Sequence, residues 1–151
     1  MKNFNNSDFI GMDAVDLLYH EPPMVLIDRV FEIYKDGVSC EVDICESSVF
    51  ADENGVPAYV GIEYMAQTIG VFDGIIRKQS GCTPEIGFLL GTRRIEFFCE
   101  RFNLGQTLKV TALRSWDGEK VVQFECKIEE IDSLKMLAKA SLTVYSPSRT
   151  I

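Results

Sequence analysis

The chain has 151 residues, the length of one ordinary domain, and a formal net charge of −8 at pH 7. An acidic chain is a poor general binder of nucleic acid, because such affinity comes largely from Lys and Arg side chains that neutralise phosphates. The sequence holds no apolar run of about 18 residues that could span a bilayer, and its start lacks the apolar segment of a signal peptide. We therefore expect a single soluble, cytoplasmic domain over residues 1–151 that binds neither nucleic acid nor a membrane.

The five cysteines are scattered along the chain and form no Cys-x-x-Cys pair. An odd number of cysteines without such a pair indicates reduced, mostly buried thiols rather than disulfides. His20 is the only histidine, so the chain offers few ligands for a metal ion, and we expect no metal site. The polar ends, residues 1–8 and 146–151, are expected to fray.

The first predicted element is a short helix over residues 13–19, where apolar residues recur with helical spacing behind a capping aspartate. Two successive prolines follow and must end this helix. Residues 24–34 and 38–49 are rich in β-branched and aromatic side chains and flank an Asp-Gly pair. This pattern predicts two strands joined as a hairpin.

A long helix is predicted over residues 60–79, because apolar residues recur there three and four positions apart on a wide face. Gly70 and Gly74 lie inside this segment. Each glycine costs about 1 kcal/mol against alanine in a helix interior, so the pair indicates close backbone packing. A helix this apolar should be buried, which requires a sheet wrapped around it.

The rest of the chain predicts strands separated by turn signals, over residues 86–90, 94–99, 107–115, 121–131 and 135–145. The last segment has residues that also favour a helix, but its β-branched and aromatic end favours a strand. The predicted fold class is α+β, with an antiparallel sheet of five to six strands wrapped around one long central helix.

This element order, together with the start of the long helix, resembles the hot-dog 3-hydroxyacyl-acyl carrier protein dehydratases. In that family a proline precedes the central helix. Near the start of the helix, an acidic residue begins a motif of the form Glu-x-Met-Ala-Gln. Here Pro57 precedes the helix, and residues 63–67 read Glu-Tyr-Met-Ala-Gln. Residues 17–30 and 102–108 resemble two further stretches of the family, so that the resemblance covers nearly the whole chain.

One departure from that family affects the mechanism. The ordinary dehydratase carries its catalytic histidine in a Gly-His-Phe-Pro-Gly loop before the acid, and the matching position here is Val49. The chain is instead similar to a divergent branch, the predicted dehydratases of aryl polyene gene clusters. The similarity rests on His-x-Pro-Pro-Met at residues 20–24 and Tyr-Val-Gly-Ile-Glu-Tyr-Met-Ala-Gln at residues 59–67.

The resemblance implies dehydration of a 3-hydroxyacyl thioester to an enoyl thioester in fatty-acid-like or polyene biosynthesis. Such a reaction requires a base for the α-proton, an acid for the departing hydroxyl and a donor for the thioester oxygen. Glu63 suits the acid, because an apolar tunnel disfavours a charged carboxylate. Gln67, one helical turn on, can orient it, and the backbone N–H groups of Ala58 and Gly61 can hold the carbonyl.

His20 has two interpretations. As the only histidine it is the candidate base. In ordinary dehydratases, however, the matching histidine is not the catalytic one, so that His20 can equally be a structural residue where helix meets strand. The geometry must decide between the two roles.

The resemblance also implies a carrier. The acidic surface of an acyl carrier protein could be met by four basic residues, Arg77, Lys78, Arg93 and Arg94. Their charge alone, however, is better explained by exposure to solvent at the end of a helix and at the edge of a strand. No cofactor is expected beyond the phosphopantetheine that arrives with the substrate on this carrier, and a CoA thioester is the other possible form.

Two further functions remain open. In a hot-dog thioesterase, Glu63 would activate water against the thioester and His20 would be structural. In a dehydratase heterodimer, the chain could be a non-catalytic subunit. The sequence does not distinguish a homodimer from a hot-dog heterodimer, because both bury the same kind of apolar sheet edge.

Overall fold

The structure is a computed structural model, and it describes residues 3–147. Its one long helix is α1 (Gly61–Gln79), and three short 3₁₀ helices are η1 (Asn6–Phe9), η2 (Ala14–Asp16) and η3 (Ala58–Val60). The strands are β1 (Arg29–Tyr34), β2 (Gly37–Asp43), β3 (Val56–Pro57), β4 (Phe88–Phe97), β5 (Arg101–Phe102), β6 (Thr107–Gly118), β7 (Val121–Glu130) and β8 (Met136–Tyr145).

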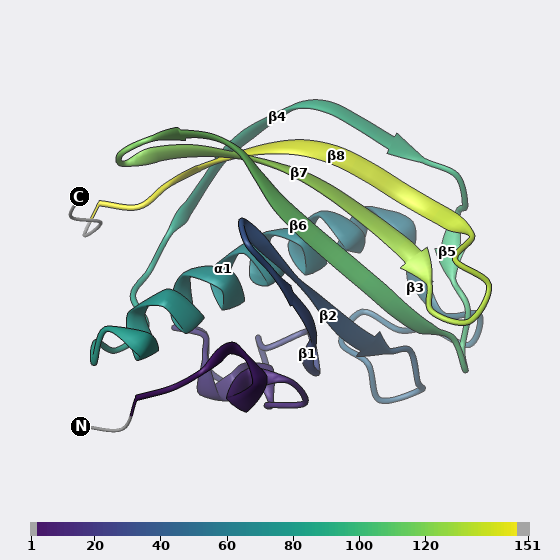
Figure 1. The fold of residues 1–151 in the computed structure, drawn as a ribbon. Helices are drawn as coiled ribbons and strands as arrows, with labels where there is room; N and C mark the ends of the chain where they lie inside the picture. Colours follow the sequence, from purple (N-terminus) through teal and green to yellow (C-terminus); the bar gives the residue numbers. More distant parts are fainter. Residues whose placement is uncertain (1–2, 148–151) are drawn as a thin grey trace.

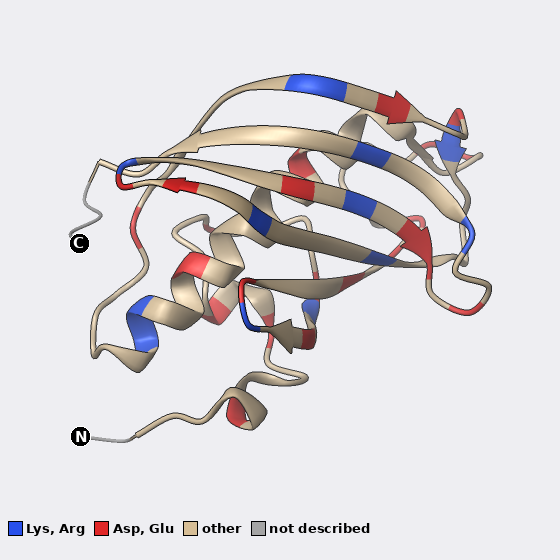
Figure 2. Cartoon of the chain, turned by 45° about the horizontal axis from the view of Figure 1, so that its top comes forward, with Lys and Arg blue, Asp and Glu red and all other residues tan. Residues whose placement is uncertain are grey.

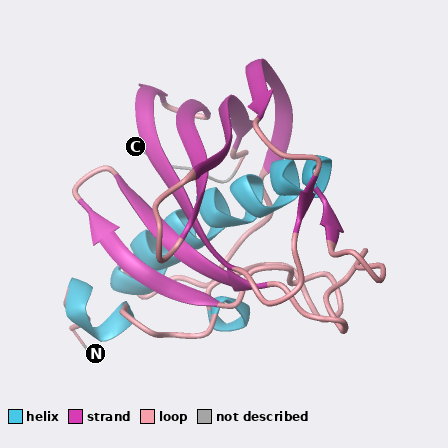
Figure 3. Ribbon diagram, turned by 90° about the vertical axis from the view of Figure 1, so that its right-hand side faces the viewer, coloured by secondary structure: helices cyan, strands magenta, loops and turns pink. Residues whose placement is uncertain are grey.

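Six strands form one antiparallel sheet in the order β1-β2-β6-β7-β8-β4, and β3 pairs with β5 in a separate two-stranded sheet. The large sheet curves around α1, which lies on its concave side (Figure 1). Seen from the side, the helix runs inside the trough of strands (Figure 3). The predicted α+β class, with a sheet wrapped around one central helix, is confirmed.

The core lies between α1 and the concave face of the sheet. Alternate residues of β7 are buried there, as the two-residue period of a strand requires: Val122, Phe124, Cys126 and Ile128. The ring of Phe72 on α1 meets that of Phe124 edge-on, with centroids 6.2 Å apart. Each large side chain buried in this way contributes about 1.5–3 kcal/mol to folding.

The chain before the sheet differs from the prediction. Only η2 is helical within residues 13–19, and the first strand begins at Arg29 instead of Met24. The reason is tertiary: Leu17 and Leu18 turn inward and are buried against α1. The Leu26 N–H donates to the side chain of Gln67 on α1, and the Met24 carbonyl accepts from it, so this segment is bonded to the helix instead of to a neighbouring strand.

Two segments predicted as separate strands, 86–90 and 94–99, form the single strand β4. Gly91 falls at one of two register shifts in its pairing with β8. A β-bulge inserts an extra residue without ending the strand, so the glycine marks a bulge here and not a turn. The second predicted strand also ends earlier, at Asp43.

The ends of the chain were predicted to fray. Residues 1–2 and 148–151 lie outside the described residues, while η1 packs Phe9 into the core.

All five cysteines are free, as predicted. Cys40 and Cys126 are buried, but Cys45 and Cys82 are exposed. Among residues 3–147, no helix is long and apolar enough to cross a membrane.

The two glycines of α1 mark close packing, as predicted. A Cβ atom on Gly74 would lie 2.0 Å from the carbonyl oxygen of Leu17, and one on Gly70 would lie 2.9 Å from Leu18 Cδ2. The first contact is with rigid backbone and the second with the end of a flexible side chain. Gly74 therefore sets how closely the backbone of residues 17–18 can approach the helix.

We predict that Gly74→Ala destabilises the protein by about 1–3 kcal/mol, because the added methyl group must push the Leu17 backbone away. Helix propensity alone predicts the opposite, a gain of about 1 kcal/mol. Urea unfolding measures the difference. Gly91→Ala is the control, because a Cβ atom there meets nothing within 4 Å, and equal effects of the two substitutions would refute the packing argument.

Candidate active site

Glu63 lies on the first turn of α1 and faces a groove of about 630 Å³, here called the α1 groove. The groove is bordered by α1, by residues 18–20, by residues 80–89 and by the inner faces of β7 and β8. Its walls are mainly apolar, with Ile69, Phe72, Phe88, Val122, Phe124 and Val144 among the lining side chains. A mainly apolar hollow with a few convergent polar groups is typical of a small-molecule site.

His20 meets Glu63 in this groove. The two residues come from segments far apart in the chain, and His20 Nε2 lies 3.8 Å from Glu63 Oε1. This distance is too long for a hydrogen bond. Both side chains are about 40% exposed (39% and 41%), so a substrate group can reach them. The structure thus brings the two predicted catalytic residues together within one chain.

His20 is held in place by the chain segments before and after it. On one side Leu17 and Leu18 pack against the two glycines of α1. On the other side residues 24–26 are hydrogen-bonded to α1. His20 Nδ1 is buried and has no hydrogen-bond partner among the described residues. The ring therefore presents only Nε2 to the groove.

Gln67 is the residue that joins these parts. Its side chain is buried, and Nε2 donates to Glu63 Oε1 at 3.0 Å and to the Met24 carbonyl at 2.8 Å. Its Oε1 accepts from the Leu26 N–H at 2.8 Å. The contact with Glu63 is the one that their spacing of one helical turn predicts. One amide thus fixes both the carboxyl group and the loop that carries His20.

The backbone donors at the helix start differ from the prediction. The Ala58 N–H donates to the Glu100 carbonyl at 3.0 Å. The Gly61 N–H donates to the carbonyls of Ala58 and Tyr59 within η3. Since both N–H groups already have partners, neither is free for a thioester carbonyl. A donor for that oxygen must come from elsewhere in this turn or from a partner subunit.

Tyr64, next to Glu63 in the chain, points away from the groove. It is buried, its ring lies 5.9 Å from that of Phe102 between centroids, and burial raises the pKa of its phenol to about 12. Tyr64 is therefore part of the core and stays neutral at physiological pH.

Val49, at the position of the usual catalytic histidine, lies in the loop after β2.

The four basic residues predicted to dock a carrier do not form one surface. Arg77 lines the α1 groove and is paired with Asp73 at 2.7 Å and Glu85 at 3.5 Å. Lys78 lies near the end of α1, with its ammonium 5.8 Å from the centre of the Phe4 ring. Figure 2 shows these cations at the end of the helix, apart from the cationic stretch of β4.

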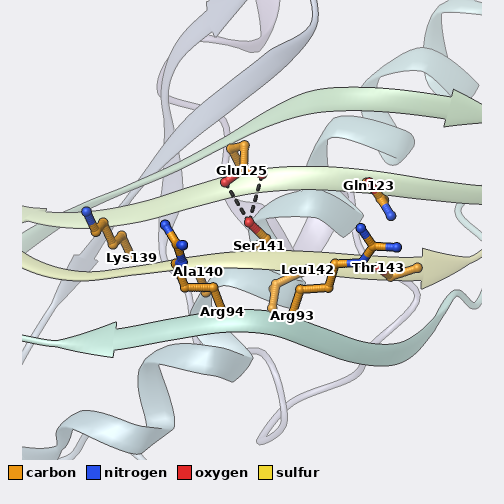
Figure 4. A pocket seen from close by; sticks show the side chains of 9 residues that line it. All are labelled: Arg93, Arg94, Gln123, Glu125, Lys139, Ala140, Ser141, Leu142 and Thr143. Carbon is orange, nitrogen blue, oxygen red and sulfur yellow. Dashed lines mark hydrogen bonds between the residues drawn. The ribbon is translucent and has the colours of Figure 1, made fainter.

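Arg93 and Arg94 line a second hollow, of about 470 Å³, on the outer face of the sheet. The register shift between Thr92 and Arg94 lets both consecutive arginines face this hollow. Beside them the Ser141 hydroxyl donates to the Glu125 carboxylate (Figure 4). Within residues 3–147 neither arginine forms an ion pair, so both guanidinium groups are available to a partner.

Sequence reasoning did not single out some residues of the α1 groove. Asp73 shares the helix face of Glu63, and this helical spacing could have revealed it. Arg114 reaches the groove from β6, and no local sequence signal indicates that.

Within residues 3–147 no group of three or more His, Cys, Asp or Glu side chains could hold a metal ion.

Residues 12–151 match the family model of ApeP-like proteins, described as ApeP dehydratase. The chain belongs to the ApeP-like dehydratase family. A solved dehydratase heterocomplex, ApeI:P from Xenorhabdus doucetiae, matches with 29% identity and a TM-score of 0.82, over 91% of this chain and 92% of that chain. The resemblance to an aryl polyene dehydratase is thereby confirmed.

More distant structures share the fold alone. A Streptococcus mutans protein bound to acetyl CoA, smu.793, matches with 15% identity and a TM-score of 0.63, over 89% of this chain and 98% of that one. A hypothetical thioesterase with coenzyme A from Streptococcus pneumoniae matches with 14% identity and a TM-score of 0.59, over 82% and 90%. No curated protein is significantly similar to the chain in sequence.

We predict that Gln67→Met, which keeps the length of the side chain, destabilises the protein by about 1–3 kcal/mol, because the Leu26 N–H loses its partner. Urea unfolding measures this loss. Gln79→Met is the control, since Gln79 makes one exposed hydrogen bond, to Asn6. Equal stability of the two variants would contradict the role given to Gln67.

Proposed function

We propose that this chain eliminates water from a 3-hydroxyacyl thioester with His20 as base and Glu63 as acid, within a complex with a second hot-dog subunit. One observation carries the proposal. In a member of a dehydratase family, the only histidine lies 3.8 Å from the helix-start glutamate, and both line a mainly apolar groove.

The distance suits the chemistry. His20 Nε2 takes the proton from the carbon next to the thioester carbonyl, and the electrons of that C–H bond form the new double bond. The C–O bond at the third carbon breaks, and protonated Glu63 gives its proton to the departing hydroxyl, which leaves as water. Because the two groups are neighbours and are not hydrogen-bonded to each other, a substrate lying beside the pair can present its α-proton to His20 and its hydroxyl to Glu63.

The second subunit is proposed from strand β4. This ten-residue strand is at the edge of the sheet, and apolar side chains on it and just after it are exposed: Phe88, Leu89, Leu90, Phe97 and Phe98. A long apolar edge is a template for pairing with another chain. Since Phe88 and Leu89 also line the α1 groove, a subunit paired there would cover the substrate.

We predict that Glu63→Gln and His20→Gln each lower dehydration by at least about 100-fold in the complex, and that the double variant is little worse. The reverse reaction, loss of the ultraviolet band of a crotonyl thioester, measures the activity of the chain alone and with the second subunit. Glu21→Gln, which alters the carboxylate next to His20 in the sequence, should keep full activity.

Each of the other possible functions predicts a different result in these assays. Release of free thiol that needs Glu63, without hydration, would indicate a thioesterase and refute the proposal. Full activity of the His20→Gln complex would make His20 structural. Loss of activity only when residues of the second subunit are changed would make this chain the non-catalytic partner.

The proposed substrate carrier is an acyl carrier protein whose phosphopantetheine brings the acyl group, and no other cofactor is required. Arg93 and Arg94 are its proposed contacts, because they are unpaired cations on an otherwise acidic chain. They belong to β4, the strand whose first residues line the α1 groove. A carrier bound there would lie along the strand that leads to the substrate.

We predict that Arg93→Glu with Arg94→Glu lowers kcat/KM for a carrier-bound substrate by about tenfold or more, mainly through slower association. The same substrate on free pantetheine should react within about twofold of the wild type. Lys78→Glu makes a similar change of charge at the end of α1. A larger effect of Lys78→Glu would place the carrier at the helix and not on the sheet.

A further inference from the structure

Strand β4 combines two features with opposite effects on pairing. At its centre, the sixth and seventh of its ten residues are Arg93 and Arg94. Figure 2 shows this basic stretch in the middle of the strand. Large apolar side chains near both ends of the strand are exposed: Phe88, Leu89, Leu90 and Phe97. The ends therefore favour contact with another chain, whereas the centre favours it only where that chain brings no positive charge.

The two arginines lie on one face of the strand. Consecutive residues of a regular strand point to opposite faces. Here the register shift between Thr92 and Arg94 interrupts the alternation, and both arginines line the hollow on the outer face (Figure 4). Neither guanidinium group forms an ion pair in the described part of the chain, and the carboxylate of the hollow, on Glu125, accepts from Ser141 instead. Two neighbouring positive charges thus remain unpaired.

A second copy of this chain would meet β4 edge to edge. The strand is the last in the order of the sheet, so one of its sides has no neighbouring strand. When two identical strands pair antiparallel over their full length, residues equally far from the two ends lie opposite each other. Phe88 of one copy would then lie beside Phe97 of the other, which favours the pair. The arginines of both copies would meet at the centre.

The four guanidinium groups of such a pair would repel one another. Neighbouring strands lie about 4.8 Å apart and residues advance about 3.4 Å along a strand, which puts the α carbons of the arginines roughly 6–11 Å apart across the two strands. This range is close to the Debye length of about 10 Å at 0.1 M salt, so the charges are only partly screened. Like charges opposite each other destabilise a pair of strands.

We propose that Arg93 and Arg94 prevent β4 from pairing with a second copy of this chain, and leave it to a hot-dog subunit without positive charge at the centre of its own edge strand. The inference rests on the second subunit of the proposed function and adds the chemistry that selects it. The apolar ends attract either partner, and the arginines reject one of them. A second copy on β4 would also cover Phe88 and Leu89, which line the α1 groove.

The test measures self-association of the full chain by sedimentation at low ionic strength. Arg93→Gln with Arg94→Gln removes the repulsion, so its dimer should have a dissociation constant at least about tenfold lower than that of the wild type. Arg93→Glu with Arg94→Glu replaces one repulsion by another and should self-associate no more than the wild type. An equimolar mixture of this glutamate variant with the wild type should pair at least about tenfold more tightly than either alone, because opposite charges then meet at the centre.

Lys35→Gln with Lys78→Gln is the matched control. It removes two positive charges as well, from the turn at the opposite edge of the sheet and from the end of α1, and should leave self-association unchanged. Leu90→Glu, added to the glutamine variant of the arginines, changes an exposed residue of the same strand and should abolish the gain. Thermal unfolding checks that each variant folds. Equal self-association of the wild type and the glutamine variant, or no pairing in the mixture, would overturn the inference.

Titration with the second subunit separates this inference from the dehydratase proposal. The glutamine variant should bind that subunit no more tightly than the wild type does, because there is no repulsion to remove; tighter binding would mean that the arginines reject every partner. If the complex dehydrates no substrate but the mixture of oppositely charged copies pairs, the proposed reaction fails and the selection by charge stands. If the complex is active but the glutamine variant does not self-associate, the selection by charge fails alone.

Discussion

The amide of Gln67 is buried between α1 and the loop that precedes the sheet, and it makes three hydrogen bonds there. In this position a polar side chain must satisfy every donor and acceptor it faces, because an unpaired buried group costs about 1–3 kcal/mol. The orientation of Glu63 and the path of residues 24–26 are therefore fixed together. The glycines at positions 70 and 74 permit the approach that brings the loop within reach of this amide.

The groove depends on the same approach. Leu18 forms part of its wall only because Gly70 and Gly74 offer no side chain that would hold residues 17–18 away from the helix. His20 follows two residues later and is placed against Glu63 by packing, without a hydrogen bond between the two. Because the two side chains are not bonded to each other, His20 Nε2 stays available, and the Glu63 carboxyl group gives only Oε1 to Gln67.

The sequence predicted the central helix, the strands around it and the contact between Glu63 and Gln67, because those features follow from periodicity and from a motif along one segment. It did not predict where the first strand starts, since residues 24–26 bond to a side chain from the distant helix. It also did not predict that the Ala58 N–H is already bonded, because its partner is the carbonyl of Glu100, just before β5, which pairs with β3. Arg114 and the bulge at Arg93 likewise depend on contacts between strands.

Both His20 and Glu63 belong to one chain, and this arrangement has a genetic consequence. Where two chains share a site across an interface, a copy that lacks one residue and a copy that lacks the other can together rebuild one intact pair. Here they cannot, because each defective copy carries its own broken pair. Alleles of the two positions would fail to complement each other, and the number of intact pairs in any assembly equals the number of unaltered copies of this chain.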